Sequence, residues 1–434
     1  MSKVTRVVEK LVGAEVRSGE WPLVLLFFAN LFLLLAAYYI LKVIREPLIL
    51  MEGGAVERSY ARGLQALLLL VLVPGYGLLA NRFEPAKLVK WIMVVFVACV
   101  GAFVALGQLG VRVGFAFFVW LGIFSTVAIA QFWSLANDVM TEADGKRLFP
   151  LVAAGGTLGG IFGAQAAARL IDGHPHQLML IAAGILVLCV MLTHVTYRVA
   201  TTRGSSTVQA PSAERDRRGG FSLVVHDRYL FLIAASVLLL NFVNTTGDFV
   251  LAQIVNTHAH SLPVAQRQGY IAAFYGDFQT AISVLTAATQ IFVVARAFKH
   301  VGIGTSLLFL PLFALGGYGV SALLPLLPVM ATVKVIENST DYSLQNTVQQ
   351  ALFLPTSRDA KYKAKAAIDT LFVRLGDLGS TGAVFIGSLV GLGTAGYALV
   401  NAVACACWIF VALRLRKLNL PARSQLPNAN ASLA

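Results

Sequence analysis

Charged residues are scarce in this chain. Only 13% of its 434 residues are Asp, Glu, Lys or Arg, whereas 57% are hydrophobic. A soluble domain carries about 25% charged residues, so the composition excludes an ordinary soluble protein. Cysteine is scarce as well: the four cysteines all lie in apolar runs, which excludes a disulfide framework and favours small core residues.

Motifs for covalent chemistry are also missing. There is no Walker lysine motif, and GGTLGG (155–160) does not follow a strand, so neither an ATPase nor a dinucleotide-binding enzyme is expected. Only His194 of the seven histidines falls inside an apolar run, which gives no metal-ligand cluster. The sequence therefore predicts no enzyme, no cofactor and no metal.

Long apolar runs are what the chain has in abundance. Runs of a length that spans a bilayer recur about twelve times, without the alternation typical of barrel strands. We therefore predict an all-α, polytopic membrane protein. The expected spans are 21–41, 61–81, 89–108, 113–136, 148–171, 177–197, 229–250, 269–295, 302–321, 323–342, 366–390 and 394–414.

A hydrophilic stretch divides these spans into two groups of equal number. We expect an amphipathic cytoplasmic segment over 1–20, a six-helix half over 21–199, a linker over 200–225, a second half over 226–417 and a disordered tail over 418–434. Most of the 34 Lys and Arg residues fall on one side of the membrane if both termini are cytoplasmic. This organisation predicts two repeated halves around a central cavity, as in the major facilitator superfamily.

Several ionisable side chains lie in or beside the apolar runs. Each costs about 2.5–3.5 kcal/mol near a helix centre, so such groups face a cavity or an ionic partner. The alternatives, ion pairs between helices and a hydrophilic pathway, both remain open for each residue. The groups are Lys42, Arg45, Glu46, Asp248, Asp277, Lys334, Glu337, Asp341, Asp369, Arg374 and Asp377.

The stretch YYILKVIREPLIL (38–50) concentrates three of these charges. Pro47 lacks a backbone donor and predicts a stop or a kink in the helix. In a helix that reaches Glu46, this side chain lies four residues from Lys42 and can pair with it.

Gly155, Gly159 and Gly163 are spaced four residues apart in one span. Such a stripe of small residues favours close packing of helices in a membrane over contact with a ligand.

Four segments carry a resemblance to a known family. They are YYILKVIREPLIL (38–50), FWSLANDVMTEADGKRLFPLVAAGGTLG (132–159), FYGDFQTAISVLTAATQIF (274–292) and DYSLQNTVQQALFLP with KYKAKAAIDTLFVRLG (341–376). Together they resemble the ATP/ADP translocase family of plastids and obligate intracellular bacteria, which is distantly related to the major facilitator fold. The resemblance implies exchange of ATP for ADP across a membrane.

The resemblance also implies roles for individual residues. Arg45 stands at a functional lysine, Glu142 at an acidic residue, Lys365 at a basic residue and Asn244 at a glutamate of the family pattern. Polyanions are bound by cations, so we expect substrate contacts from Lys42, Arg45, Asn137, Asn244, Lys334 and Arg374. We expect gating or coupling roles for Glu46, Glu142, Asp248, Asp277, Lys365 and Asp369.

The chain departs from the family pattern at several places, and other functions stay open. Val43 and Ile44 replace polar residues, and Gly247 replaces a tryptophan. We therefore consider three hypotheses. The first is a monomeric nucleotide antiporter in a bacterial inner membrane. The second is a proton-coupled transporter of another organic anion, with Asp248 or Asp277 carrying the proton. The third is a membrane sensor or scaffold that does not transport.

Overall fold

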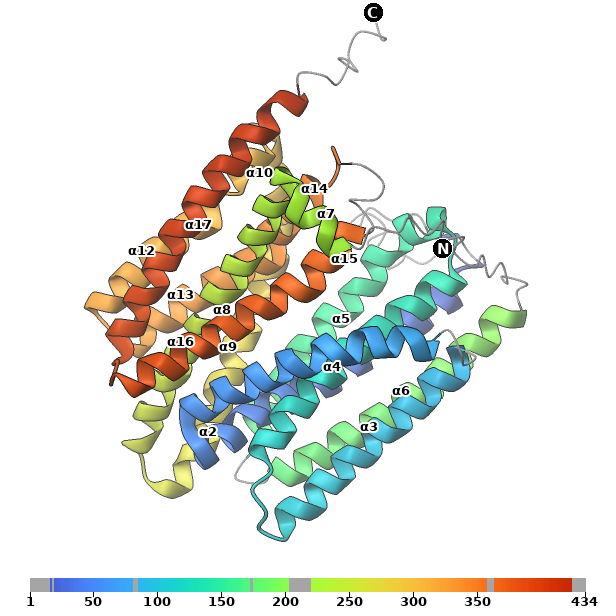
Figure 1. Cartoon of the computed structure of the whole chain (residues 1–434). Helices are drawn as coiled ribbons and strands as arrows, with labels where there is room; N and C mark the ends of the chain where they lie inside the picture. The colour runs from blue at the N-terminus through green and yellow to red at the C-terminus, as the bar shows by residue number, and fades with distance from the viewer. Residues whose placement is uncertain are drawn as a thin grey trace, which may run out of the picture. The chain divides into compact units, whose positions relative to one another are not determined.

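The computed structural model describes residues 16–17, 19–80, 85–171, 175–202, 220–356 and 363–423, and every regular element within these ranges is helical. The all-α prediction is confirmed (Figure 1). The long helices are α2 (Trp21–Ala80), α3 (Pro85–Gln108), α4 (Gly114–Val139), α5 (Glu142–Leu170), α6 (Pro175–Thr202), α8 (Arg228–His260), α9 (Val264–Phe292) and α17 (Thr394–Arg423). The shorter elements are α7 (Gly220–His226), α10 (Val294–His300), α11 (Ile303–Ser306), α12 (Phe309–Leu323), α13 (Leu327–Thr340), α14 (Asn346–Leu352), α15 (Lys365–Ala367), α16 (Val373–Leu389) and two π-helices, η1 (Asp341–Gln345) and η3 (Ile368–Phe372).

Each expected span coincides with helical segments. By length and hydropathy alone, eight helices of the described residues could cross a membrane, or nine if the bent pair α9 and α10 is one span. The other expected spans coincide with shorter helices, two of which continue through the π-turns η1 and η3. Side chains on the outward faces of these helices are large and apolar, as a lipid surface requires.

The first two expected spans both belong to α2, which is interrupted at Gly54. Its φ of 69° and ψ of −167° lie in a region that is essentially restricted to glycine. Pro47 does not end the helix but lies inside it, because membrane helices tolerate proline when neighbours satisfy the freed carbonyl. Lys42, Arg45 and Glu46 are therefore helical residues and not part of a loop.

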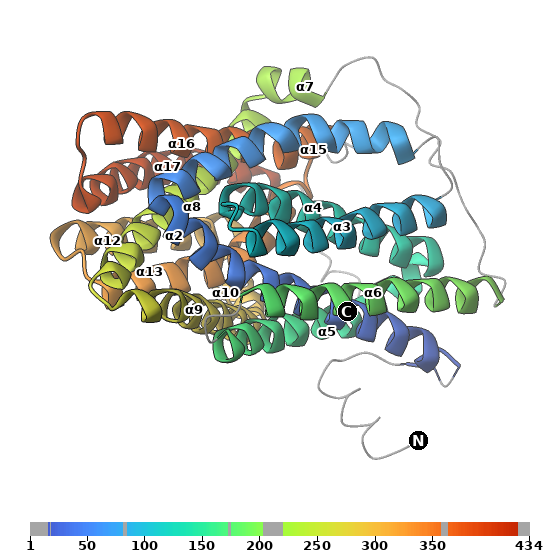
Figure 2. The ribbon, with the colours of Figure 1, turned by 90° about the horizontal axis from the view of Figure 1, so that it is seen from below.

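The chain divides into two compact units. Unit 1 comprises 1–53, 72–213 and 259–283, and unit 2 comprises 54–71, 214–258 and 284–434. In unit 1, α3 lies beside α6 (Figure 1). In unit 2, α12 lies beside both α13 and α17 (Figure 2). The proposed division into sequence halves stays a prediction, since each unit here includes a segment from the other half.

The expected terminal segment, linker and tail fall mainly on residues outside the described ranges. Where they are described, three parts are helical: α6 continues to Thr202 and α7 begins at Gly220 within the expected linker, and α17 continues to Arg423 within the expected tail.

The glycine stripe of α5 packs against the backbone of α2 within unit 1. A Cβ atom at any of its three positions would overlap a backbone carbonyl oxygen of α2: Phe28 for Gly155, Phe32 for Gly159 and Ala36 for Gly163. The packing interpretation of the stripe is therefore confirmed, and the two backbones approach closely because no side chain separates them.

We expect Gly159→Ala to lower the melting temperature of the detergent-solubilised protein, because the added methyl group must push α5 away from α2. The control is Gly184→Ala on α6, where a Cβ meets nothing within 4 Å and helix propensity improves. Equal melting temperatures for the two variants would contradict this packing.

Candidate functional site

Lys334 is the centre of a buried ionic cluster in unit 2. Its side chain on α13 is 0% exposed, and its ammonium lies 3.1 Å from a carboxylate oxygen of Asp248 and 3.1 Å from one of Glu337. It also donates to the backbone oxygen of Asn244 at 3.0 Å. These partners from α8 and α13 satisfy all three donors of the ammonium, which is what a buried lysine needs to stay charged.

Arg62 extends this cluster to further helices of unit 2. It lies on the part of α2 that follows Gly54, 3.6 Å from Asp248 and 3.6 Å from Asp377. Asp377 on α16 accepts a hydrogen bond from Thr245 at 2.6 Å and pairs with Arg374 at 3.3 Å. Charged groups from α2, α8, α13 and α16 are thus joined in one network.

Asn244 and Asp341 form the polar margin of the cluster. The Asn244 amide donates to Asn338 at 3.0 Å and to the Asp341 carboxylate at 3.5 Å. Among the described residues Asp341 forms no ion pair, in contrast to Asp248 and Asp377.

Two π-turns lie next to residues of the cluster. Asp341 opens η1, directly after α13, and η3 ends just before Arg374 in α16. Each π-turn adds one residue to a helix and is frequent at functional sites.

Gly247 leaves room for the phenol of Tyr318. The Tyr318 hydroxyl donates to the Glu337 carboxylate, and a Cβ at Gly247 would overlap this hydroxyl. The glycine that replaces a tryptophan of the family pattern is therefore required by the packing of α8 against α12.

Arg45 and Glu46 form a separate buried pair in unit 1. The guanidinium lies 2.5 Å from the Glu46 carboxylate and 4.0 Å from the centre of the Phe118 ring. Lys42 is half-buried, and its ammonium lies 5.1 Å from the ring centre of Tyr39 and 5.9 Å from that of Tyr38. We expected Glu46 to pair with Lys42, whereas in the structure Glu46 pairs with Arg45.

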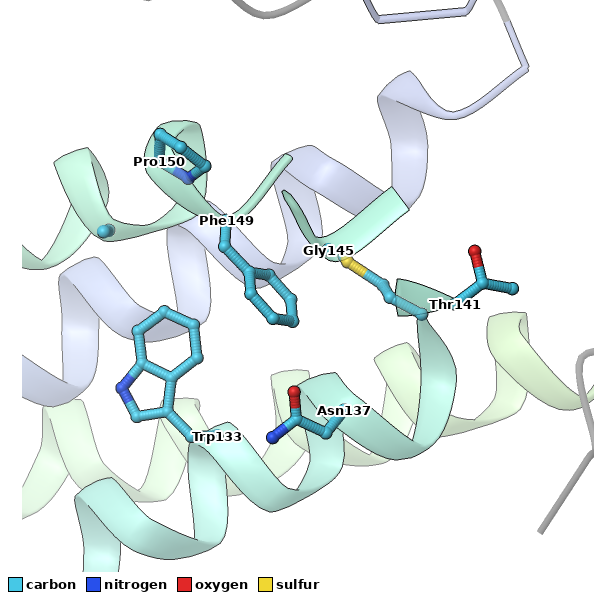
Figure 3. Close-up of a pocket in the computed structure, with 8 residues that line it drawn as sticks. Trp133, Asn137, Thr141, Gly145, Phe149 and Pro150 are labelled. Atoms are coloured by element: carbon cyan, nitrogen blue, oxygen red, sulfur yellow. The ribbon is translucent and has the colours of Figure 1, made fainter. Parts of the chain in front are cut away.

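A pocket of about 660 Å³ lies between α4 and α5 in unit 1. Its lining includes Trp133, Asn137, Thr141, Gly145, Phe149 and Pro150. Figure 3 shows the Phe149 ring, the Trp133 indole and the Asn137 amide directed toward the same space. Asn137, an expected substrate contact, is thus one of two polar side chains, with Thr141, in a pocket that also contains two aromatic rings and that we call the α4–α5 pocket.

A cluster of ion pairs holds the start of α5 against the residue that precedes α2, next to this pocket. Arg147 makes two hydrogen bonds to Glu20, of 2.8 and 2.7 Å, and one to Asp144 of 3.0 Å. The bond from Arg147 holds the pKa of Glu20 below its ordinary value. The Thr141 hydroxyl, followed by Arg147, lowers the pKa of Asp144. Both carboxylates therefore stay ionised at neutral pH and anchor α5 to the start of α2.

The remaining expected residues lie elsewhere. Asp277 is exposed and accepts a hydrogen bond from Gln165 at 3.1 Å within unit 1. Lys365 and Asp369 pair with each other at 2.8 Å, and both are partly exposed. Glu142 begins α5, but its side chain lies outside the described residues.

Sequence reasoning placed Asn244, Asp248, Lys334 and Arg374 among the site residues, and the structure joins these four in one network. It did not include Arg62, which the structure adds to this network through Asp248 and Asp377. The available signal was that Arg58 and Arg62 stand one helical turn apart at the start of an apolar run.

Long apolar helices that carry paired ionisable side chains are typical of a multi-pass membrane protein, and this chain is one. The fold is similar to the crystal structure of the nucleoside transporter NupG, with a TM-score of 0.66 at 14% identity over 92% of this chain and 99% of that one. It is similar to a bacterial homologue of the iron transporter ferroportin in its inward-facing state, with a TM-score of 0.66 at 12% identity over 91% and 99% of the two chains. The prediction of a major-facilitator-like fold is confirmed.

The chain belongs to the TLC ATP/ADP transporter family, whose sequence model matches residues 115–418. It is 25% identical over 303 residues to ADP,ATP carrier protein 1, chloroplastic, of Arabidopsis thaliana, a match that covers 61% of this chain and 46% of that protein. It is 21% identical over 346 residues to ADP,ATP carrier protein 1 of Chlamydia pneumoniae, covering 70% and 67%. The match spans less than half the length of the chloroplast carrier.

We expect Lys334→Met to destabilise the protein by about 3–5 kcal/mol, because it leaves Glu337 buried without its cation and leaves Asp248 with the more distant Arg62. Adding Glu337→Gln should recover part of this loss, since one uncompensated carboxylate is removed. Melting of the solubilised protein measures both effects.

Lys365→Met is the matched control, since an exposed i,i+4 pair contributes only about 0.3–0.5 kcal/mol. An equally small effect at position 334 would show that the cluster does not stabilise unit 2.

Proposed function

We propose that this protein is a nucleotide antiporter of the ATP:ADP type that works by alternating access around a basic anion site. The observation that carries the proposal is the match to the TLC ATP/ADP transporter family over residues 115–418. The transporter fold supports it independently. Exchange of this kind makes and breaks no covalent bond, so the protein has only to bind, enclose and release an anion.

The Lys334 cluster gives this proposal a physical mechanism. In the structure its cations are neutralised by Asp248, Glu337 and Asp377. Phosphate oxygens bind the same ammonium and guanidinium groups, so a bound di- or triphosphate can replace carboxylates as the counter-charge. Without substrate, the cations pair with these carboxylates when the site closes. With substrate bound, the cations pair with its phosphates instead.

Lys42 is the cation of unit 1 that we assign to substrate phosphates. Its ammonium lies over two tyrosine rings and has no carboxylate within ion-pair distance among the described residues. It can therefore accept a phosphate without breaking an existing pair. Arg45 is already paired with Glu46, so its contribution to phosphate binding requires that this pair opens.

The geometry of η1 supports a change of conformation in unit 2. The amide of Gln345 is buried and has no hydrogen-bond partner in the described part of the chain. A buried amide without a hydrogen-bond partner raises the free energy of this conformation. Gln345 therefore favours a second conformation in which its amide forms a hydrogen bond. The partly exposed pair of Lys365 and Asp369 suits a gate, and we assign gating roles to these two residues and to Glu142 and Asp277.

We further propose a monomer in a bacterial inner membrane with both termini in the cytoplasm, because this orientation places most Lys and Arg residues inside. Its partners are the lipid bilayer and a small anionic substrate.

Proton-coupled transport of another organic anion is the second candidate. The observation that favours it is Asp341, a carboxyl group of the cluster without an ion pair among the described residues. Such a group can carry a proton across the membrane. Of the two carriers expected from the sequence, Asp248 lies within ion-pair distance of two cations and is less suited to this role, and Asp277 lies outside the cluster.

The test of function is uptake of labelled ATP into proteoliposomes that contain the full chain. ATP uptake that depends on internal ADP is the expected result. Uptake that is absent with internal ADP at every imposed pH gradient contradicts nucleotide exchange. Uptake that needs an inward proton gradient and not internal ADP supports the second candidate, and Asp341→Asn should then abolish it.

We expect Lys42→Gln to raise the KM for ATP about tenfold, as loss of one charged contact of about 1.5 kcal/mol predicts. Folding should be unaffected, because no ion pair is broken. Arg112→Gln is the control, since it removes one positive charge from a turn region of unit 1. A KM equal to that of the wild type would remove Lys42 from the substrate site.

A further inference from the structure

We propose that the α4–α5 pocket binds the nucleobase of the substrate, with Trp133 and Phe149 as the stacking surface and Asn137 as the group that reads the base edge. This inference rests on the proposed nucleotide transport and names a site for the part of the substrate that carries no charge.

The first argument is the size and the uncharged lining of the pocket. Its volume of about 660 Å³ is within the usual range for small-molecule sites. None of the described residues that line it is Asp, Glu, Lys or Arg. The described lining offers a phosphate group no counter-charge, whereas a neutral purine ring loses little by leaving water.

The second argument is the geometry of the two aromatic side chains. Trp133 and Phe149 meet edge to face, with ring centres 5.3 Å apart and an angle of 72° between planes. In an edge-to-face pair, the ring that presents its edge keeps both faces free of its partner. Since both residues line the pocket and are only half-buried, a base can stack on an open face.

Gly145 helps to hold the Phe149 ring in this position. A Cβ at Gly145 would lie 3.0 Å from the ring, closer than ordinary packing allows. The glycine on the first turn of α5 therefore lets the ring lie flat over the backbone, beside the cluster of Arg147 that anchors this turn.

The third argument is the free amide of Asn137. It is exposed in the pocket, points toward the same space as the two rings (Figure 3), and forms no hydrogen bond within the described part of the chain. An amide presents one donor and one acceptor side by side. This pair matches the adjacent amino group and ring nitrogen of adenine.

The experiment compares three probes on the purified full-length protein: ATP, adenosine and inorganic tripolyphosphate. Binding is measured by calorimetry. We expect Trp133→Ala to weaken ATP and adenosine about 5- to 150-fold, the range found for loss of one stacking contact. Tripolyphosphate, which has no base, should bind as it does to the wild type.

The matched control is Trp91→Ala on α3, which removes a tryptophan that is 68% exposed and not among the lining residues. It should leave all three affinities unchanged. Phe149→Leu repeats the test if Trp133→Ala unfolds. Asn137→Ala, at an exposed side chain, should reduce the preference for ATP over GTP without changing tripolyphosphate binding.

The outcomes separate this inference from the proposed function. Unchanged ATP and adenosine affinities in Trp133→Ala and Phe149→Leu overturn the base site, while wild-type exchange of ATP for ADP still stands. Equal losses for ATP and tripolyphosphate also overturn it, because the pocket would then act on the phosphates. Adenosine binding that these variants lose, in a protein without nucleotide uptake, supports the pocket and overturns the transport proposal.

Discussion

The cost of keeping Lys334 charged in an apolar interior determines how unit 2 is built. Moving an ammonium out of water costs several kcal/mol, which only close partners can offset. Asp248 and Glu337 supply the charge and the Asn244 carbonyl supplies a further acceptor, so α8 and α13 must keep their register. Gly247 is small because Tyr318 needs the space to reach Glu337. Packing of α8, α12 and α13 thus follows from one side chain.

The fold could be predicted from the sequence to a large extent, whereas the pairing of charges between different helices could not. Apolar runs specify membrane helices directly, since the bilayer leaves a chain few alternatives. The buried charges could be recognised for the same reason. Their partners depend on which helices meet, which spacing along the chain does not encode. Arg45 illustrates the limit: the Phe118 ring on α4 holds its guanidinium, so it pairs with the adjacent Glu46.

The two units differ in chemistry, each within its own structure. Unit 2 concentrates ionisable groups around Lys334, and these groups pair with one another. Unit 1 contains the α4–α5 pocket, whose described lining is uncharged, and the half-buried Lys42. Under the proposed nucleotide exchange, the cations are the groups for phosphates and the aromatic pocket is the group for a base.

The π-turn η1 has a consequence for how this family can change. A π-turn counts as one residue inserted into an α-helix. The wide turn itself takes up the extra residue, so removing one residue from 341–345 would restore regular helical bonding there and leave α14 facing its present neighbours. The effect of the extra residue is therefore confined to Asp341–Gln345, the segment that contains the buried Gln345 amide. A change of one residue in length at this turn can alter the local backbone without turning the helix beyond it.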